Sequence, residues 1–491
     1  MQNAKPVDAR AELEADCEPE AAALIIALVT EYLSTSRDRS APVSAAHDQR
    51  ALSQRFDEPM PRQGRPLAQV AARIRRDVLP DSNWLYHPRA MGHQVAPPLP
   101  AAIWSESLIA ALNQSVAVFE MSPVGTTIER RVVRWMCDLV GFGPGATGTM
   151  TTGGTEATFT ALLAARAAVM PDAWENGVGA NPPILVCSEH AHYAVTRPAG
   201  ELGLGTKNIV TVGSDGFRMS PRALHGALTM AKTDERTVLA VSATASSTPT
   251  GTFDDLSAIA DVCDEFGVWL HVDGAHGASA LLSATHRARL KGIERARSIA
   301  WDPHKMMLLP LQAGVLLMRD AADLDRAYAQ KAPYLFHERE EPDQGTRSFL
   351  CSRRADALKM WIALQRYGAD GIGSLFDHLC TMTAALHEAV TNHPHFDAPH
   401  VPDCNILCFR WVGDRSRDDP TLDRINLEGR ERYNRSGEGW VTTTLLNGRR
   451  VLRVTVMNPR TTRDDVEAVL NGLAGACDVA ALPSSAARPP D

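Results

Sequence analysis

The sequence has no run long enough to span a membrane, no excess of positive charge and no internal repeat. Its longest apolar run near the start, Ala21 to Thr30, is about half of the ~20 residues that a transmembrane helix needs, and Glu31 follows it. We expect this run to form a buried helix, and nothing in the sequence resembles a signal peptide. The formal net charge of −8 argues against nucleic acid and anionic membranes as partners, so a small polar metabolite is the expected ligand.

Cysteine is sparse and irregularly placed. The nine cysteines are an odd number and none stands in a C-x-x-C pair, so neither a disulfide framework nor a zinc site is expected. Cysteines in this number and spacing fit a reducing compartment, and we expect the protein to be cytoplasmic. No metal is expected either, because the histidines lack the spacing of metal ligands; they include His190, His192, His271, His276 and His304.

The composition is that of a globular protein large enough for two or three domains, with 491 residues of which 44% are hydrophobic and 22% are charged. Residues 1–105 alternate helical stretches with Pro- and Arg-rich breaks, which predicts an N-terminal helical arm ending at the run Ala96 to Pro100. Residues 106–370 alternate short apolar runs with helical patterns, which predicts an α/β domain with a mostly parallel sheet. The expected strands are Ile184–Cys187, Val238–Val241, Val268–Val272 and Gly314–Met318.

Residues 371–482 follow a different pattern, in which a helix precedes strand-like runs and a last helix. This order predicts a small α+β domain. The expected elements are strands at Asn405–Val412, Trp440–Leu446 and Val451–Met457 and a helix at Arg463–Leu473. Residues 483–491 are rich in Pro, Ser and Ala, and we expect them to be disordered.

The segment Ser298 to Met306 carries the strongest chemical signal, because a short apolar run and a Pro turn lead to His304 and Lys305. A lysine after a strand is more often an ordinary surface charge. A lysine used in Schiff-base chemistry must spend part of its time as a neutral amine, and a site that excludes water favours that state. The neighbours of Lys305 therefore decide between the two interpretations.

A second apolar run, Trp269 to Val272, ends in Asp273 and is followed by small residues. Ligands of open α/β sheets gather at such strand ends. A buried carboxylate there needs a cation, which a protonated pyridine nitrogen supplies; a helix cap or an ordinary salt bridge is the simpler alternative. Because Asp273 and Lys305 each follow a predicted strand, we expect them to face the same crevice.

Two further segments follow predicted strands. Gly153, Gly154 and Thr155 precede a helix-compatible run to about Val169, and such a glycine-rich helix start can bind a phosphate, although it is only a helix cap in most proteins. It lacks the lysine of a Walker loop and the spacing of a dinucleotide fingerprint. His192 follows the strand-like run at Ile184–Cys187 and could stack on a flat ring, although a lone histidine is more often structural.

Together these segments resemble the group II decarboxylases that depend on pyridoxal 5′-phosphate (PLP), the family of glutamate, cysteine sulfinate, diaminobutyrate and aromatic amino acid decarboxylases. The likeness covers about residues 85–465. Several independent motifs occur in the expected order: His87–Arg89, Ser122–Glu129, Gly153–Ala157, His192, Asp273, Pro303–Lys305, Tyr334–His337, Cys351–Trp361 and Asn458–Thr462.

The resemblance implies a fold of the aspartate aminotransferase type (fold type I), with a large PLP-binding domain and a small C-terminal domain, assembled as a homodimer with the active site at the interface. It implies that Lys305 carries PLP as a Schiff base, that Asp273 pairs with the pyridinium nitrogen and that His192 stacks over the ring. The other implied cofactor residues are Gly154, Thr155, Thr248, Ala275 and His304. The implied substrate residues are Arg353, for the α-carboxylate, and His93 and Gln94.

Departures from the family are few. Gly274 stands where the family usually has alanine, and Ser352 where it usually has glycine. A larger departure is the stretch His337 to Arg347, which looks short and contains no tyrosine, whereas these decarboxylases carry a loop tyrosine that protonates the substrate carbon. Either His192, His337 or a water supplies the proton, or the reaction ends in another product, such as an aldehyde.

The expected function is therefore PLP-dependent decarboxylation of an L-amino acid to its amine and CO₂. The likeness of residues 301–312 to glutamate and cysteine sulfinate decarboxylases hints at an acidic substrate, such as glutamate, aspartate or cysteine sulfinate. A basic substrate such as diaminobutyrate stays open, because the sequence identifies no dedicated cation for a side-chain carboxylate. Another PLP reaction is the second hypothesis. An inactive PLP-fold binding protein is the third, and it predicts loss of Lys305 or Asp273, both of which are present.

Overall fold

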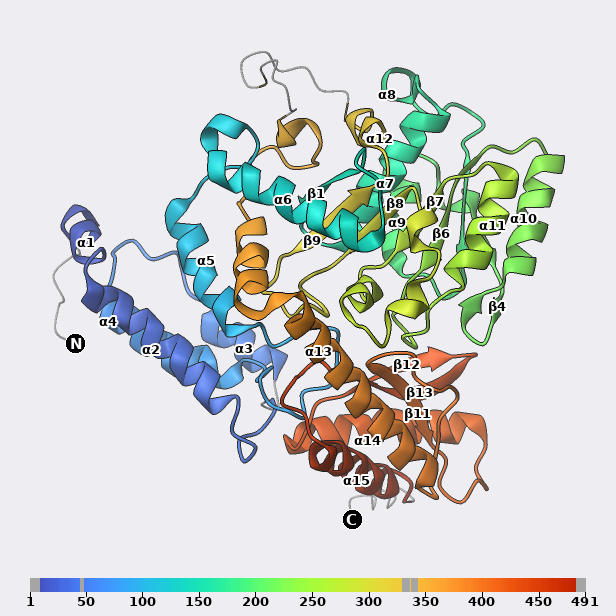
Figure 1. Ribbon diagram of the computed structural model, residues 1–491. Helices are drawn as coiled ribbons and strands as arrows, with labels where there is room; N and C mark the ends of the chain where they lie inside the picture. Colours follow the sequence, from blue (N-terminus) through green and yellow to red (C-terminus); the bar gives the residue numbers. More distant parts are fainter. Residues whose placement is uncertain (1–8, 45–47, 329–335, 337–342, 483–491) are drawn as a thin grey trace. The chain divides into compact units, whose positions relative to one another are not determined.

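The computed structural model describes residues 9–44, 48–328, 336 and 343–482 (Figure 1). The chain divides into two compact units. The large unit comprises Gln94–Ala384 and His400–Cys408, and the small unit comprises Met1–His93, Ala385–Pro399 and Phe409–Asp491. The domain boundaries expected from the sequence stay predictions, and the expected disordered tail, 483–491, lies outside the described residues.

A seven-stranded sheet forms the centre of the large unit (Figure 1). Strand β9 runs antiparallel to β1 and β8, while the other neighbours are parallel, so the predicted mostly parallel sheet is confirmed. Across the sheet the strands are β1 (Thr147–Thr151), β9 (Gly314–Met318), β8 (Ser298–Trp301), β7 (Leu270–Asp273), β6 (Val238–Thr244), β2 (Ile184–Ser188) and β3 (Ile209–Val212). The four strands predicted from the sequence are among them, although β7 begins at Leu270, two residues after the predicted start at Val268.

Helices flank this sheet, so its inner strands are buried almost throughout, as expected for parallel strands covered on both faces. Helix α7 packs across β6, β7, β8 and β9, and alanines such as Ala157 and Ala161 are fully buried in that contact. The helices that begin in this unit are α5 (Pro100–Leu112), α6 (Pro123–Val140), α7 (Gly154–Val169), α8 (Ala173–Asn176), α9 (Tyr193–Glu201), α10 (Pro221–Thr233), α11 (Leu256–Phe266), α12 (Ala321–Asp325) and α13 (Ala357–Asn392). Strands β4 (Ser214–Asp215) and β5 (Arg218–Met219) form a separate short hairpin.

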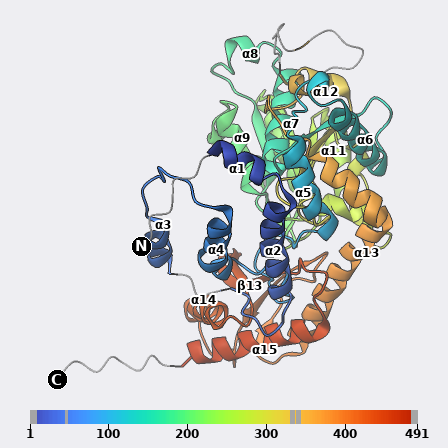
Figure 2. The same cartoon turned by 90° about the vertical axis from the view of Figure 1, so that its left-hand side faces the viewer.

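The small unit combines helices with a four-stranded sheet, which agrees with the predicted α+β pattern. Its helices are α1 (Ala9–Ala15), α2 (Pro19–Thr35), α3 (Gln49–Phe56), α4 (Leu67–Asp77), α14 (Asp419–Ser436) and α15 (Arg463–Ala480). The strand order is β10 (Phe396–Asp397), β11 (Ile406–Trp411), β13 (Arg449–Thr455) and β12 (Thr442–Leu446), and β11 begins in the large unit. Both views show α2 beside α4 and α14 beside α15 (Figures 1 and 2).

The apolar run at residues 21–30 forms a helix as predicted, since it lies inside α2. The expectation that the run is buried is only partly correct. Leu28 is buried, but Ile25 and Ile26 are 41% and 50% exposed, because only one stripe of α2 faces its neighbours. None of the described helices is long and apolar enough to cross a membrane.

Candidate active site

A cavity of about 510 Å³ opens in the large unit where parallel strands end. The register places Thr244, the last residue of β6, beside Asp273, the last residue of β7, and Asp273 beside Ala300 of β8. Side chains that follow these strands therefore converge. The cavity brings together nine residues singled out from the sequence: Gln94, Gly154, Thr155, His192, Thr248, Asp273, Ala275, His304 and Lys305.

Two predicted substrate residues do not line this cavity. Arg353 is buried, and its Nη1 and Nη2 each donate to a carboxylate oxygen of Glu129 at 2.8 Å. The ion pair engages the guanidinium that was expected to bind a substrate carboxylate, so that role stays a prediction. His93, in the small unit, lies 5.1 Å from the Trp440 ring between centroids.

Lys305 follows β8 through a tight turn in which its backbone N–H donates to the carbonyl of Asp302. Its side chain is 19% exposed, and its Nζ lies 3.3 Å from Oδ2 of Asp302. Asp302 itself is buried and also lines the cavity. Sequence reasoning missed this carboxylate although it stands three residues before the lysine, because nothing in the sequence showed that the turn folds its side chain back onto Lys305.

Asp273 is held at the end of β7 with its carboxylate toward the cavity. Its Oδ1 accepts the N–H of Ala275 at 3.2 Å, and the described residues give it no ion-pair partner. A buried carboxylate that has no ion-pair partner among the described residues suits a cationic ring nitrogen. His271, two residues earlier, bonds to Ser298 and Thr158, and burial lowers its pKa to about 4, so it is a neutral structural residue.

The start of α7 forms a cradle suited to an anion. A Cβ on Gly154 would lie 2.8 Å from the Cβ of Ala275 and 3.1 Å from Oδ2 of Asp302, so this position has room for glycine alone. The first N–H groups of a helix have no partners within it, and they carry the positive end of its dipole. His304 borders the cradle, with Nδ1 2.7 Å from the carbonyl oxygen of Ala313, and burial lowers its pKa.

His192 occupies the residue before α9, where its Nδ1 accepts the N–H of Ala194 at 3.2 Å. A neutral ring with this bond carries its proton on Nε2. Burial lowers the pKa of His192, which favours the neutral ring. The imidazole lines the cavity, so it offers a flat face and one N–H group there.

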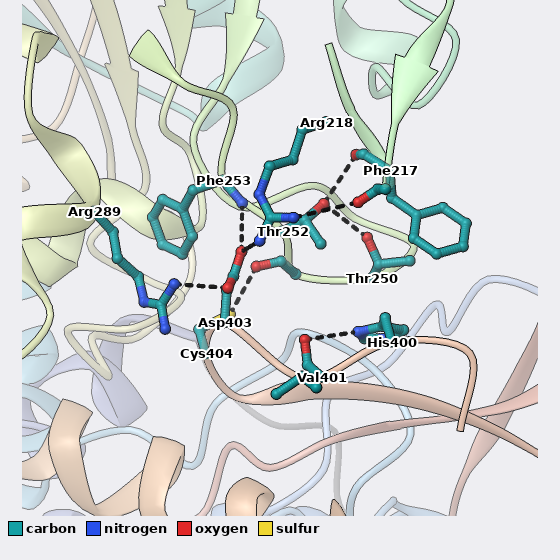
Figure 3. A network of polar contacts seen from close by, with 12 residues as sticks. Phe217, Arg218, Thr250, Thr252, Phe253, Arg289, His400, Val401, Asp403 and Cys404 are labelled. Carbon is teal, nitrogen blue, oxygen red and sulfur yellow. Dashed lines mark hydrogen bonds and ion pairs between the residues drawn. The ribbon is translucent and has the colours of Figure 1, made fainter. Parts of the chain in front are cut away.

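The segment His400–Cys408 fixes the loop after β6 (Figure 3). The carboxylate of Asp403 accepts bonds from Arg289 at 2.6 Å, from Arg218 at 2.5 Å and from the backbone N–H of Phe253 at 3.1 Å (Figure 3). Cys404 donates from its thiol to the carbonyl of Gly251. This loop carries Ser246 and Thr248 of the cavity wall, so a distant segment positions that wall.

Other lining residues went unnoticed in the sequence because no motif marks them. They include Ser246, Leu311 and Gln312, whereas His276 was considered only as a metal ligand. His276 is held by a 2.7 Å hydrogen bond from its Nε2 to Oδ1 of Asn405, a partner 129 residues away. Tyr334, Leu335 and His337 lie outside the described residues, so the structure says nothing of that motif. Among the residues that it does describe, no group of three His, Cys, Asp or Glu side chains is arranged to hold a metal ion.

Comparison with known proteins identifies the family. The model of the pyridoxal-dependent decarboxylase conserved domain matches residues 50–412. The L-2,4-diaminobutyrate decarboxylase of Rhizobium meliloti (strain 1021) is 36% identical over 421 residues, which are 85% of this chain and 83% of that protein. The cysteine sulfinic acid decarboxylase of Mus musculus is 34% identical over 392 residues, which are 78% of this chain and 79% of that protein.

Solved structures agree with this result. A crystal structure of mouse CSAD in apo form superposes with a TM-score of 0.88 at 30% sequence identity, over 94% of this chain and 99% of that chain. The predicted fold class is thereby confirmed. The residues of the cavity also fit PLP, because a lysine, a carboxylate without an ion-pair partner and a helix-start anion cradle meet in one place.

Proposed function

The chain belongs to the pyridoxal-dependent decarboxylase family, and from this premise we propose that the cavity at the strand ends of the large unit is its cofactor and substrate site. Membership makes the protein a PLP-dependent amino acid decarboxylase, a carboxy-lyase of amino acid metabolism. The roles of individual residues, the substrate and the assembly are the proposed part.

Different residues of the cavity would hold different parts of the cofactor. Lys305 is the proposed covalent attachment point, and Asp273 the partner of the ring nitrogen. Gly154, Thr155 and His304 would hold the phosphate, while His192 and Ala275 would flank the two ring faces and Thr248 would line the side. When bound, PLP draws electrons from the bond that breaks at the substrate α-carbon. The chain itself would orient the reacting groups and would hold the buried carboxylate of Asp273 for the ring nitrogen.

The observation that carries this proposal is the convergence of Lys305, Asp273 and the start of α7 on one cavity. We expect Lys305→Ala to lose the cofactor's absorbance band near the visible edge and to lower activity by more than about a thousandfold, because no other amine can take its place. Absorbance spectra and CO₂ release measure both effects. Lys207→Ala is the control, since Lys207 is an exposed lysine outside the cavity. An unchanged band in Lys305→Ala would refute the attachment point.

We further propose an acidic substrate, and Gln94 supports this choice. Its amide Nε2 is buried at the cavity wall without a hydrogen-bond partner among the described residues. An unpaired N–H donor suits a carboxylate or sulfinate side chain, whereas an ammonium side chain needs an acceptor. Glutamate, aspartate and cysteine sulfinate are the proposed candidates, and diaminobutyrate is the alternative.

Exchanging the amide for a carboxylate tests the substrate class. Gln94→Glu keeps the size of the side chain and reverses its preference, so kcat/KM for the acidic substrate is expected to fall about 10- to 100-fold, the equivalent of one charge-assisted hydrogen bond. Diaminobutyrate should be decarboxylated relatively better by the variant. CO₂ release from the four amino acids measures the outcome. Preference for diaminobutyrate in the unmodified enzyme would contradict the acidic assignment.

Proton delivery is a separate proposal. His192 is a titratable residue whose ring offers an N–H at the cavity, from Nε2, and we assign it the return of the proton to the substrate carbon. The expected product is then an amine. Chemical identification of the product in the same assays decides this, because an aldehyde would show that the reaction takes another course after CO₂ has left.

A homodimer in the cytoplasm is the proposed state of the enzyme. Helix α5 exposes Trp104, Leu108 and Leu112 at four-residue intervals, which aligns them along one face of the helix. Such an exposed apolar stripe fits a subunit interface. All nine cysteines are free thiols, and seven of them are buried, which supports a reducing compartment.

A further inference from the structure

Thr248 of the cavity wall lies in a turn that follows β6. The N–H of Ser247 donates to the carbonyl of Thr252 at 2.8 Å, so the turn closes on itself. Its base joins the sheet, because the N–H of Ala245 donates to the carbonyl of Asp273 at 2.8 Å. The position of Thr248 in the cavity then depends on the contacts that hold the turn beyond its base.

A distant segment holds this turn from outside. The thiol of Cys404 donates to the carbonyl of Gly251 at 3.3 Å, and a Cβ on Gly251 would lie only 2.9 Å from that sulfur, so the two segments pack closely. The carboxylate of Asp403 accepts the backbone N–H of Phe253 at 3.1 Å (Figure 3). A hydrogen bond to a charged acceptor is stronger than one between neutral groups, so Asp403 is the firmer of the two contacts.

The same carboxylate joins the turn to the hairpin of β4 and β5. Arg218 of β5 and Arg289 each donate to Asp403 (Figure 3). The hairpin contacts the turn a second time, because Oγ1 of Thr252 donates to the carbonyl of Phe217 at 3.0 Å. Asp403 therefore connects the turn, the hairpin and its own segment at one point.

The hairpin also contacts a second wall of the cavity. Nε2 of His190 lies 3.1 Å from Oγ of Ser214, and the rings of His190 and Phe217 lie 5.4 Å apart between centroids. His190 stands two residues before His192, which lines the cavity. One hairpin thus contacts both the segment that leads to His192 and the turn that carries Thr248.

We propose that Asp403 is a positioning residue of the active site, because it joins the turn carrying Thr248 to the hairpin that contacts the segment of His192. Cofactor and substrate would bind against those two side chains, so the placement of the two walls sets how both are held. Asp403 is not among the described residues that line the cavity, so its effect passes through the walls. A misplacement of about 1 Å can cost about a hundredfold in rate. This inference rests on the proposed cofactor and substrate site.

Asp403→Asn tests the role, since it keeps the shape of the side chain and removes the charge. The side chains of Arg218 and Arg289 are 39% and 40% exposed, so both released guanidinium groups reach water and the variant should fold. We expect its Kd for PLP to rise about tenfold and its kcat/KM to fall about 10- to 100-fold, because both walls shift. Absorbance titration of the full chain with PLP and measurement of CO₂ release give these values.

Asp323→Asn is the matched control. Asp323 is a buried carboxylate of the same unit that accepts hydrogen bonds from two arginines, Arg297 and Arg326, and it is not among the described residues that line the cavity. Both variants should lose stability toward chemical denaturation. Only Asp403→Asn should lose PLP affinity and kcat/KM, while Asp323→Asn stays within about twofold of the unmodified protein in both.

Hydrogen exchange shows where the variant acts. Loss of the charged acceptor should speed exchange of the amides of residues 247–253 by about tenfold in Asp403→Asn and leave them unchanged in Asp323→Asn, because only the first variant lets the turn open more often. A double-mutant cycle with Thr248→Val then tests the route. If Asp403 acts through Thr248, the double variant loses less kcat/KM than the product of the two single losses.

Arg218→Gln is a milder variant, which removes the link to the hairpin and leaves Asp403 paired with Arg289. It should change Kd and kcat/KM in the same direction by about two- to fivefold, as expected for one partly exposed ion pair. This variant decides the question if Asp403→Asn does not fold.

The possible results separate the positioning role from the site itself. Equal losses of PLP affinity and kcat/KM in Asp403→Asn and Asp323→Asn overturn the positioning role, and so does no loss in Asp403→Asn and Arg218→Gln. A double variant whose loss equals the product of the single losses overturns the route through Thr248. All of these results leave the cofactor site intact, whereas failure of the unmodified protein to bind PLP overturns that site.

Discussion

The ion-pair partner of Arg353 is visible only in the folded protein. Its sequence context resembles that of the family, but the context does not show that Glu129, 224 positions earlier, accepts both of its terminal N–H groups. Glu129 also accepts the backbone N–H of Met150 at 3.1 Å, so this one carboxylate of α6 bonds both to β1 and to Arg353, which precedes α13. This geometry suits a structural ion pair.

The pair can be tested by removing one partner at a time. Breaking a buried ion pair leaves an uncompensated charge, so Arg353→Met is expected to lower the free energy of unfolding by about 3–5 kcal/mol. Glu129→Gln should also destabilise the protein, while the double variant with methionine at both positions should recover part of the loss. Chemical denaturation measures these changes.

Kinetics on the same variants separates the two roles of Arg353. A structural pair predicts similar kcat/KM values for folded Arg353→Met and Glu129→Gln. If Arg353 binds the substrate α-carboxylate, Arg353→Met alone should lose about 10- to 100-fold in kcat/KM, the worth of one charge-assisted contact. That second result would establish the role expected from the sequence.

At the scale of elements, periodicity located most of the strands and helices that position the cavity. Strands β2, β6 and β9 begin at the expected residues, and α7 covers the expected stretch. These elements were predictable because both faces of a parallel sheet are buried, which leaves continuous apolar runs in the sequence. The convergence of Asp273 and Lys305 followed from one rule, that parallel strands end at the same edge.

Other features of the cavity wall depend on contacts between distant segments. The loop that carries Thr248 is held by Asp403 and Cys404, more than 150 residues later (Figure 3). No local pattern marks such a contact, because hydrogen bonds between loops have no periodicity. The half-exposed face of α2 has a similar cause, since an apolar run shows that a helix can be buried but not how much of it is covered.

At the scale of the whole molecule, the fold restricts the choice of cofactor more than it restricts the choice of reaction. The same fold accommodates many reactions, and structures less than 25% identical to this chain support the fold alone. The family relationship selects decarboxylation, while the proposed acidic substrate depends on wall residues such as Gln94. The proposed assembly rests on the surface of α5.

The exposed stripe of α5 leads to a prediction about assembly. Leu108 is 48% exposed, and Trp104 and Leu112 flank it on the same face, at 41% and 47%. Because leaving such a stripe in water is unfavourable, the unmodified protein is expected to form dimers, and Leu108→Lys to shift the equilibrium toward monomers by placing a charge in the interface. Light scattering coupled to size-exclusion chromatography measures the mass at several concentrations.

Met230→Lys is the matched control, since Met230 of α10 is 67% exposed and belongs to no such stripe. It should leave the mass unchanged. If the active site needs the interface, Leu108→Lys should also lose activity upon dilution, and higher protein concentration should restore it by mass action. A monomeric unmodified protein at all concentrations, or a Leu108→Lys dimer as stable as the original, would show that α5 has another role.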